Sequence, residues 1–295
     1  PINFVSLRAL MSLDVIYETV EEPVDPDGID YPHRFLFLQH NDLGSFEYLH
    51  PEWTNFSYLS LTTLPISSIT LHPEWINLST IEIVNCSIGN PTLYSEWSSL
   101  YELSLSNINM DSFDSYDWPA IGTINLGSNK LSGEFVCGKW PTLWSLQLQS
   151  NNLTAFTGNP STNHLQSLYL QDNSINSFTP GKLYQMSYLN LTNNVLTSFS
   201  GDPSLINLQN LYLNDNLITS FNGEPTWIQL RTIWLINNDL STFHILPQWT
   251  NLQQLYFQGN HFTDFDCYSS SLQQLYLSNN DISSCLLVVC QSFLR

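Results

Sequence analysis

Residue types that could do chemistry are few in this sequence and are spread thinly along it. Its seven histidines are scattered, no serine stands in a nucleophile elbow, and no glycine-rich phosphate loop opens a helix. The stretch DPDGID groups Asp25, Asp27 and Asp30 around a glycine, as in loops that bind hard cations. It lacks the glutamate at the end of the loop and the flanking helices of an EF-hand. We interpret it as an exposed acidic turn, and we expect no metal site, no cofactor and no enzymatic activity.

Five cysteines are present, an odd number that leaves at least one unpaired unless a partner chain supplies another. Three of them, Cys267, Cys285 and Cys290, lie near the end, where a bridge between Cys267 and Cys290 would close the last part of an extracellular chain. Cys86 and Cys137 are expected to be free and buried. No CxxC pair occurs, which argues against a zinc site.

Charge is strongly unbalanced, with 7 Lys and Arg against 26 Asp and Glu and a formal net charge of -19. Such a field repels phosphate backbones and anionic membranes, so nucleic acid is not an expected partner. The chain opens at Pro1 with no basic and then apolar leader, and its late apolar run, 285–290, is far shorter than the roughly 20 residues that cross a bilayer. We expect a soluble chain with no membrane insertion.

One motif, LxxLxLxxNxL, occurs twelve times in the sequence. Its copies are 20 to 23 residues apart, and their ninth places are Asn41, Leu64, Cys86, Ile108, Asn129, Asn151, Asn173, Asn194, Asn216, Asn238, Asn260 and Asn280. We expect a cap or degenerate first repeat with an acidic insertion over 1–32, twelve repeats over 33–285, and a C-terminal cap or tail over 286–295. A single copy cannot bury its apolar side, so neighbouring copies must stack.

The pattern resembles the leucine-rich repeat family, particularly the short 22-residue type of bacterial internalins, over about residues 33–285. This resemblance implies an α/β repeat solenoid, a horseshoe or arc with a concave parallel β-sheet and a convex side of extended or short-turn segments. Each copy has one short strand whose fourth and sixth residues point inward, and its ninth residue, asparagine, can bond the turn that follows. Leu64, Cys86 and Ile108 replace that asparagine, so we expect an interrupted hydrogen-bond ladder in the first third.

Two further aromatic columns fall at fixed places in the repeat. A phenylalanine recurs at Phe46, Phe113, Phe135, Phe156, Phe178, Phe199, Phe221, Phe243 and Phe265, and a tryptophan at Trp53, Trp75, Trp97, Trp118, Trp140, Trp227 and Trp249. An aromatic binding stripe is one interpretation, but a single fixed slot favours interior packing. The same packing interpretation covers His50 and His72, which precede two of these tryptophans in LHPEW.

The third, fifth and seventh residues of each strand should face outward on the concave sheet. Aromatic rings crowd the fifth places of the second half, beside neutral amides. The predicted ligand-binding residues are Gln147, Tyr169, Gln171, Tyr188, Tyr212, Trp234, Tyr256, Gln258 and Tyr276. Rings cover apolar faces and amides satisfy hydroxyl or peptide groups, so a glycan or an extended peptide would suit this surface. Alternatively, rings favour strands and stabilise one another without any ligand, although an exposed aromatic patch is costly unless a ligand or another copy covers it.

Five glycosylation sequons permit a secreted location, at Asn55, Asn77, Asn85, Asn152 and Asn190. Asn190 occupies a fifth place within the aromatic row, where a sugar would obstruct a ligand. Together with the low lysine count and the terminal cysteines, these sites favour an extracellular or cell-surface recognition module that binds a protein or a glycan. The alternative is a structural subunit that assembles with copies of itself into a filament or coat by head-to-tail stacking.

Overall fold

A computed structural model describes residues 34–39, 49, 51, 56–266 and 269–286 of the 295-residue chain. Several predicted features lie outside the described residues: the cap over 1–32 with Asp25, Asp27 and Asp30, the sequon at Asn55, the Cys267–Cys290 bridge and the tail over 287–295. The chain divides into two compact units, 1–131 and 132–295, each of which is described separately.

The first unit carries five parallel strands, each paired with the next in sequence order. They are β1 (Arg34–Gln39), β2 (Phe56–Thr62), β3 (Thr80–Val84), β4 (Glu102–Ser104) and β5 (Thr123–Asn125). Leu59 and Leu61 of β2 pair with Ile81 and Ile83 of β3, and all four side chains are completely buried. Equivalent residues of successive repeats therefore meet side by side, as the repeat pattern predicts.

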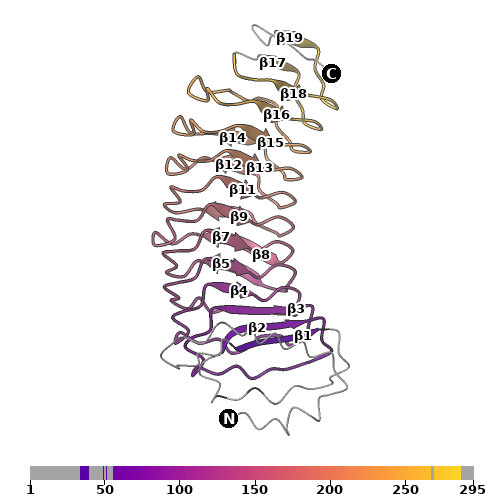
Figure 1. The fold of residues 1–295 in the computed structure, drawn as a ribbon. Helices are drawn as coiled ribbons and strands as arrows, with labels where there is room; N and C mark the ends of the chain where they lie inside the picture. The colour runs from indigo at the N-terminus through magenta and orange to yellow at the C-terminus, as the bar shows by residue number, and fades with distance from the viewer. Residues whose placement is uncertain (1–33, 40–48, 50, 52–55, 267–268, 287–295) are drawn as a thin grey trace. The chain divides into compact units, whose positions relative to one another are not determined.

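The second unit continues the same plan with seven parallel strands of three residues each. They are β7 (Ser145–Gln147), β9 (Ser167–Tyr169), β11 (Tyr188–Asn190), β13 (Asn210–Tyr212), β15 (Thr232–Trp234), β16 (Gln254–Tyr256) and β18 (Gln274–Tyr276). Pairing again joins equivalent places, such as Leu189 with Leu211 and Tyr212 with Trp234. Figure 1 shows these strands following one another along the unit, one per coil.

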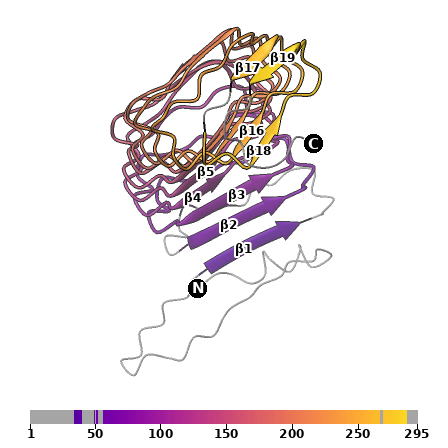
Figure 2. The ribbon, with the colours of Figure 1, turned by 90° about the horizontal axis from the view of Figure 1, so that it is seen from above.

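Further strands lie on the opposite side of the coils in the second unit. β6 (Ser132–Val136), β8 (Asn152–Thr157) and β10 (Ser177–Thr179) form one parallel sheet, β12 (Ser198–Ser200) pairs with β14 (Ser220–Asn222), and β17 (Asp264–Asp266) pairs with β19 (Ser284–Leu286). In Figure 2, β17 and β19 lie across the coil from β16 and β18. This side is built from extended segments and turns, as predicted. Across the described ranges, no helix has the length and apolar character needed to span a bilayer.

The interior holds the aromatic columns that the sequence predicts. Neighbouring phenylalanine rings of the second unit, from Phe135 to Phe243, lie 5.1 to 6.4 Å apart between centroids. The described tryptophans of the tryptophan column are buried. Several of them donate the indole N–H to a backbone carbonyl of the preceding repeat: Trp227 donates to Asp202 at 3.0 Å, and Trp249 donates to Glu224 at 2.9 Å. The packing interpretation is confirmed for the described tryptophans and for the buried phenylalanines Phe135, Phe156, Phe199, Phe243 and Phe265, whereas Phe113, Phe178 and Phe221 are half-buried. His72 shares it, because its ring lies against Trp75 and its Nε2 is 2.7 Å from the carbonyl oxygen of Leu49.

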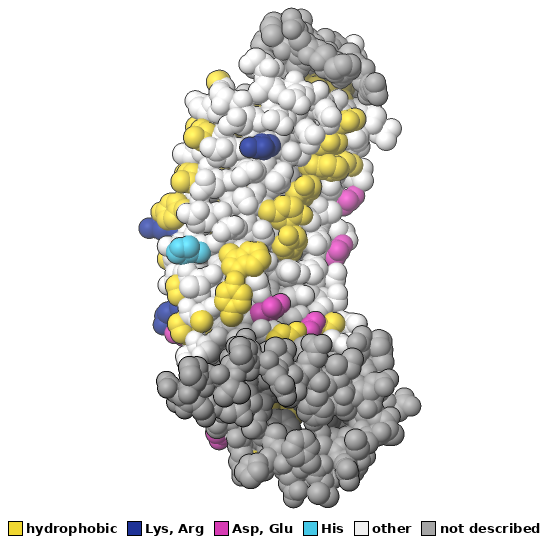
Figure 3. Space-filling model, viewed as in Figure 1, with side chains coloured by type: hydrophobic (Ala, Val, Ile, Leu, Met, Phe, Trp, Pro, Cys, Tyr) yellow, Lys and Arg dark blue, Asp and Glu magenta, His cyan; other side chains and the backbone are white. Residues whose placement is uncertain are grey.

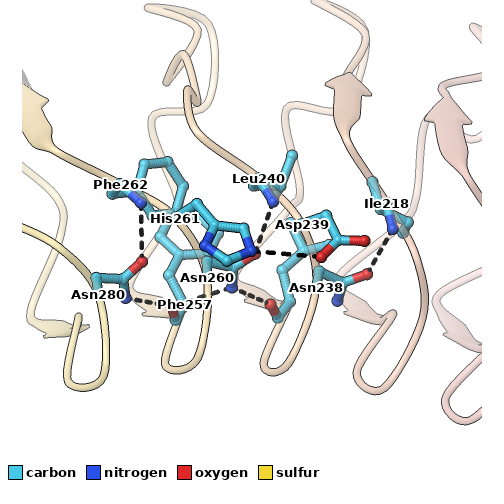
Figure 4. Close-up of polar contacts among 10 residues, drawn as sticks. Ile218, Asn238, Asp239, Leu240, Phe257, Asn260, His261, Phe262 and Asn280 are labelled. Atoms are coloured by element: carbon cyan, nitrogen blue, oxygen red, sulfur yellow. Dashed lines mark hydrogen bonds and ion pairs between the residues drawn. The ribbon is translucent and has the colours of Figure 1, made fainter.

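The turn asparagines link each repeat to its neighbours. Asn216 donates to the carbonyl oxygens of Leu191, Leu213 and Asn214, and its Oδ1 accepts the backbone N–H of Leu196. Figure 4 shows the same arrangement at Asn238, Asn260 and Asn280.

The predicted interruption of this ladder in the first third is confirmed. Leu64 and Ile108 place buried apolar side chains in the asparagine slot and can donate no hydrogen bond. Cys86 is a partial substitute, because its thiol lies 3.7 Å from the Leu61 carbonyl oxygen and 3.5 Å from that of Val84. These are two of the three carbonyl positions, 25 and two residues back, that Asn216 serves in its own repeat.

The residue before each turn asparagine has a left-handed backbone, a feature that the sequence analysis missed. In ten described copies a non-glycine residue holds a φ between 53° and 59° at this eighth place, and Gly259 holds 68° in another. Asparagine and aspartate tolerate this conformation best after glycine, and five of the ten are Asn and two are Asp. The signal was therefore present in the sequence as an Asx-rich column beside the turn asparagine.

Candidate binding face

The predicted binding residues of the second unit lie on the outward face of its seven-stranded sheet, called the sheet face below. In β13, Leu211 is completely buried between Asn210 and Tyr212, which are both half-buried. The same pattern holds in β9, β11 and β16. Side chains alternate along a strand, so the third, fifth and seventh places share this face, as expected.

Six rings form a continuous aromatic band across this face. The members of the aromatic band, in spatial order, are Tyr169, Tyr188, Tyr212, Trp234, Tyr256 and Tyr276. Successive ring centroids are 4.9, 5.2, 5.7, 3.9 and 4.7 Å apart. Figure 3 shows a diagonal row of hydrophobic side chains on the face that carries these strands.

Tyr188 keeps the aromatic band unbroken where the fifth place holds an asparagine. Its ring comes from the third place of β11, yet it contacts both Tyr169 and Tyr212, which stand in fifth places of the flanking strands. Asn190, the fifth residue of that repeat, folds its Oδ1 onto the backbone N–H of Thr192 at 3.0 Å. A third-place tyrosine thus substitutes for the missing fifth-place ring.

The rings of the aromatic band cover one another's faces. Trp234 and Tyr256 are inclined by 19°, Tyr256 and Tyr276 by 9°, and the other neighbours by 34° to 41°. An aromatic ring has a negative face and a positive edge. Because each interior ring has a neighbour on both sides, the aromatic band offers mainly ring edges and phenol groups to a ligand.

The sheet face of the second unit carries no charge at its outward strand places. Every third, fifth and seventh residue from Ser145 to Ser278 is uncharged. They are Ser145, Gln147, Gln149, Ser167, Tyr169, Gln171, Tyr188, Asn190, Thr192, Asn210, Tyr212, Asn214, Thr232, Trp234, Ile236, Gln254, Tyr256, Gln258, Gln274, Tyr276 and Ser278. In a protein of net charge -19, this face is therefore suited to an uncharged partner.

Four polar atoms of the sheet face are buried and have no hydrogen-bond partner. They are the Oε1 atoms of Gln149, Gln171 and Gln258 and the indole Nε1 of Trp234. All three glutamines stand in seventh places. Asn214, also in a seventh place, instead accepts the Ile236 backbone N–H at 2.9 Å. A buried polar atom that lacks a partner costs about 1–3 kcal/mol, so these four atoms mark places where a ligand group would be favourable.

Burial in the aromatic band changes the ionisation of its phenols. The pKa of Tyr212 is raised by desolvation. The pKa of Tyr188 is raised first by desolvation and then by Tyr212 and Tyr169, and that of Tyr256 first by desolvation and then by Tyr276 and Tyr212. These phenols therefore stay neutral beyond the ordinary range, and each keeps an O–H that can donate.

The first unit presents a different, acidic patch on its own sheet. Glu82 of β3 accepts hydrogen bonds from the Ser60 hydroxyl at 2.8 Å and the Tyr58 phenol at 3.3 Å. Burial, and then Glu82, raise the pKa of Tyr58. The sequence analysis did not identify this group, although Tyr58 and Ser60 stand in the third and fifth places of one strand and Glu82 in the fifth place of the next.

The described sequons lie in different settings. Asn77, Asn85 and Asn152 are exposed, whereas Asn190 is half-buried on the sheet face. Cys86 and Cys137 are free and buried, as predicted, and burial raises the pKa of the Cys137 thiol to about 12. Within the ranges that the structure describes, no three His, Cys, Asp or Glu side chains are grouped as metal ligands.

Comparison with known proteins identifies the fold. The family model described as Leucine Rich Repeat matches residues 271–293, and no curated protein sequence matches the chain. A leucine-rich repeat protein of Leptospira interrogans has a similar structure at 23% identity and a TM-score of 0.66, covering 85% of this chain and 67% of that one.

Two other solved structures are similar. The functional domain of InlJ from Listeria monocytogenes, which includes a cysteine ladder, matches at 18% identity and a TM-score of 0.57, over 85% of this chain and 64% of that one. The plant peptide hormone receptor RGFR1 in complex with RGF2 matches at 21% identity and a TM-score of 0.53, over 83% of this chain and 47% of that one. This chain thus spans less than two thirds of both proteins. At these identities the similarity shows the fold alone, and it confirms the predicted leucine-rich repeat solenoid of internalin-like type.

Proposed function

From its leucine-rich repeat fold, we propose that this chain is a recognition module that binds an uncharged polar partner, a protein or a glycan, through the sheet face of its second unit. The observation that carries this proposal is the continuous aromatic band on a sheet whose outward strand places hold no charged side chain. Such a band exposes apolar area that a partner would cover, and the flanking amides can satisfy the polar groups of that partner. The plant peptide hormone receptor RGFR1 in complex with RGF2 is an example of recognition by another protein of similar fold.

The test compares the wild-type chain with a variant carrying Tyr212→Ala and Trp234→Ala. Both proteins would be screened against a phage-displayed library of random short peptides and an array of neutral glycans. We expect probes that bind the wild type to lose binding to the variant, because the centre of the aromatic band is removed. The matched control carries Tyr184→Ala and Ile206→Ala, two exposed apolar residues outside the strands of the sheet face.

Three results would count against this function. One is that no probe binds the wild type, and another is that binding survives in the Tyr212 and Trp234 variant. The third is that the variant unfolds, measured by circular dichroism, which would make the aromatic band a part of the scaffold. The double substitution removes three ring contacts, Tyr188–Tyr212, Tyr212–Trp234 and Trp234–Tyr256. At about 0.5–1.5 kcal/mol per ring pair this should cost about 1.5–4.5 kcal/mol in total, so we expect the variant to fold.

Self-assembly into a filament or coat, the alternative that the sequence predicts, is tested by light scattering on the same samples. Polymers that persist in the Tyr212 and Trp234 variant would favour the structural role. A monomer at every concentration would favour the recognition role.

We also propose an extracellular or cell-surface location, supported by the low lysine count and by exposed sequons at Asn77, Asn85 and Asn152. After secretion from eukaryotic cells, treatment with an N-glycosidase should lower the mass of the protein. Mass spectrometry should find Asn190 unmodified, because a sugar there would stand on the binding face. A glycan at Asn190 would contradict the proposed face, and a chain without any glycan would remove the support that the sequons give to this location.

A further inference from the structure

The geometry of the aromatic band discriminates between the two classes of partner. A sugar binds an aromatic residue by laying its apolar C–H face on an open ring face, as the ring quadrupole favours. In the aromatic band the interior faces are already occupied, most closely where Trp234 and Tyr256 stack at 3.9 Å. Only the outer sides of Tyr169 and Tyr276 lack a neighbour within the band. The open surface therefore consists mainly of ring edges and phenol groups, which suit polar and aliphatic groups of a polypeptide better than sugar rings.

The unpaired atoms beside the aromatic band specify what such a polypeptide must bring. Gln149, Gln171 and Gln258 each have an amide oxygen without a donor, and Trp234 has an N–H without an acceptor. A peptide main chain carries both kinds of group, an N–H and a carbonyl, at every residue except proline. Neither an apolar surface nor a carboxylate cluster would satisfy three acceptors and one donor together.

Resting on the proposed function, we propose that the aromatic band takes an uncharged, extended polypeptide segment that runs across the strands. The segment donates amide N–H groups to Gln149, Gln171 and Gln258 and accepts the Trp234 N–H on a carbonyl oxygen. Its side chains contact the ring edges of the band. Absence of charge follows from the outward places of the sheet face, where a charged partner would lose water without gaining an opposite charge.

The dimensions of the aromatic band set the length of this segment. Its six rings stand on six neighbouring strands, which at a spacing of about 4.8 Å extend over about 24 Å. An extended chain advances about 3.3 Å per residue, so about seven residues would span the six rings or, shifted by one strand, the six repeats from Gln149 to Gln258.

Binding requires the glutamine side chains to move. Their unpaired oxygens and the Trp234 N–H are all covered in the free protein, so no ligand atom reaches them in that conformation, and the indole must shift as well. A glutamine side chain can rotate about several single bonds. An amide buried without a hydrogen bond costs free energy, and that cost is removed when the amide rotates outward and gains a hydrogen bond from the ligand. The free face is thus closed over its polar groups, and the ligand opens it.

The experiment uses the full chain and a phage-displayed library of uncharged random peptides of about seven residues. An enriched peptide would be synthesised, and its dissociation constant measured by calorimetry with the wild type and with Gln171→Met, Gln258→Met and Trp234→Phe. These substitutions remove one hydrogen-bonding group while keeping the length of the side chain or an aromatic ring in the stack. We expect each to weaken binding by about two- to tenfold. Gln185→Met, at an exposed glutamine outside the strands, is the matched control and should leave binding unchanged.

Chitohexaose and cellohexaose are measured in parallel with the same proteins. If the peptides bind but none of the three substitutions weakens them, the polar anchors are wrong. If the sugars bind through the aromatic band and no peptide does, the polypeptide assignment is wrong while the proposed function stands. If Tyr212→Ala with Trp234→Ala also leaves binding unchanged, or if neither class of probe binds, both proposals fail. Circular dichroism melting of each variant confirms that it is folded before its affinity is interpreted.

Discussion

The turn asparagine is the side chain that most directly couples one repeat to the next. Asn216 makes four hydrogen bonds to backbone groups of its own and the preceding repeats while 6% exposed. Few residue types can do this, because the slot requires two donors and one acceptor on a short side chain. Cys86 keeps only weak sulfur contacts in the same slot, and Leu64 and Ile108 keep none.

Replacing Asn216 with Ala should lower the free energy of unfolding by about 2–4 kcal/mol, because buried carbonyl and N–H groups lose their partners. Urea denaturation followed by circular dichroism measures the change. Asn207→Ala is the control, since Asn207 is only half-buried and donates one bond, to the Tyr184 carbonyl oxygen. An effect at Asn216 no larger than at Asn207 would show that the ladder is dispensable.

Tyrosines of the aromatic band should lose their phenol protons at a higher pH than ordinary tyrosines. Below pH about 10 the folded and unfolded chains both keep their phenols protonated, and the raised pKa values have no effect on stability. As the pH rises further, the unfolded chain loses these protons first, so the free energy of unfolding should fall until the folded phenols ionise as well. Near-ultraviolet absorbance of tyrosinate in the folded chain should therefore include a late phase.

The chain unfolded in urea supplies the reference titration for this prediction. In the folded chain, Tyr188→Phe with Tyr212→Phe should reduce the late phase. Coincident folded and unfolded titration curves would contradict the proposed burial of these phenols.

Each coil is built from a short strand, a left-handed residue and a turn that asparagine closes in most coils. The left-handed residue is the place where the sequence fits least well. Thr63 occupies this position with a φ of 56°. A β-branched residue is strained there, because its Cβ crowds the following carbonyl, whereas asparagine tolerates the conformation.

Thr63→Asn should therefore raise the free energy of unfolding by about 1 kcal/mol. Thermal or urea denaturation measures the gain. Thr70→Asn, at an exposed threonine outside the left-handed column, makes the same chemical change without relief of strain and should have little effect. A loss of stability in Thr63→Asn would show that the threonine is favoured there for another reason.

The strands that form the sheet face of the second unit are only three residues long, so pairing with neighbours rather than strand length holds each in place. The aromatic band adds ring contacts along the same direction, which is why part of its role is structural. Its stacked geometry supports the alternative that rings stabilise one another, and the unpaired atoms beside it support recognition. Both roles are compatible, since the proposed binding would use ring edges and the ring contacts use ring faces.

For the molecule as a whole, the dominant electrostatic fact is an excess of 19 negative charges. Among the described residues, the ion pair between His261 and Asp239, at 3.5 Å, offsets little of it, since it is charged only when the histidine is protonated. Mutual repulsion of carboxylates destabilises a compact chain, and salt screens it.

Raising NaCl from about 0.01 M to about 0.3 M should increase the melting temperature, because the Debye length falls below the distances between surface carboxylates. Circular dichroism melting measures the shift. A sucrose series separates this screening from general stabilisation by a cosolvent. A melting temperature independent of salt would indicate that the carboxylates are already neutralised within the folded protein.

The amino-acid sequence was sufficient to predict the solenoid, the inward leucines, the buried tryptophan column, the phenylalanine column and the outward aromatic row. Each of these features depends on a residue type that recurs at a fixed position within the repeat. Because the repeats stack with the same conformation, a fixed position within the repeat becomes a fixed side of the solenoid. Leu211, Trp227 and Tyr212 were assigned their sides by spacing alone, and burial agrees with all three.

Three properties emerged only from the folded chain. The rings of Trp234 and Tyr256 stack face to face, the oxygens of Gln149, Gln171 and Gln258 lack donors, and Tyr58 and Ser60 bond Glu82 across two strands. Each depends on side-chain rotation and on contacts between repeats. A repeat pattern fixes which residue stands at a place, whereas the direction in which its side chain turns depends on neighbours that are brought beside it only by folding.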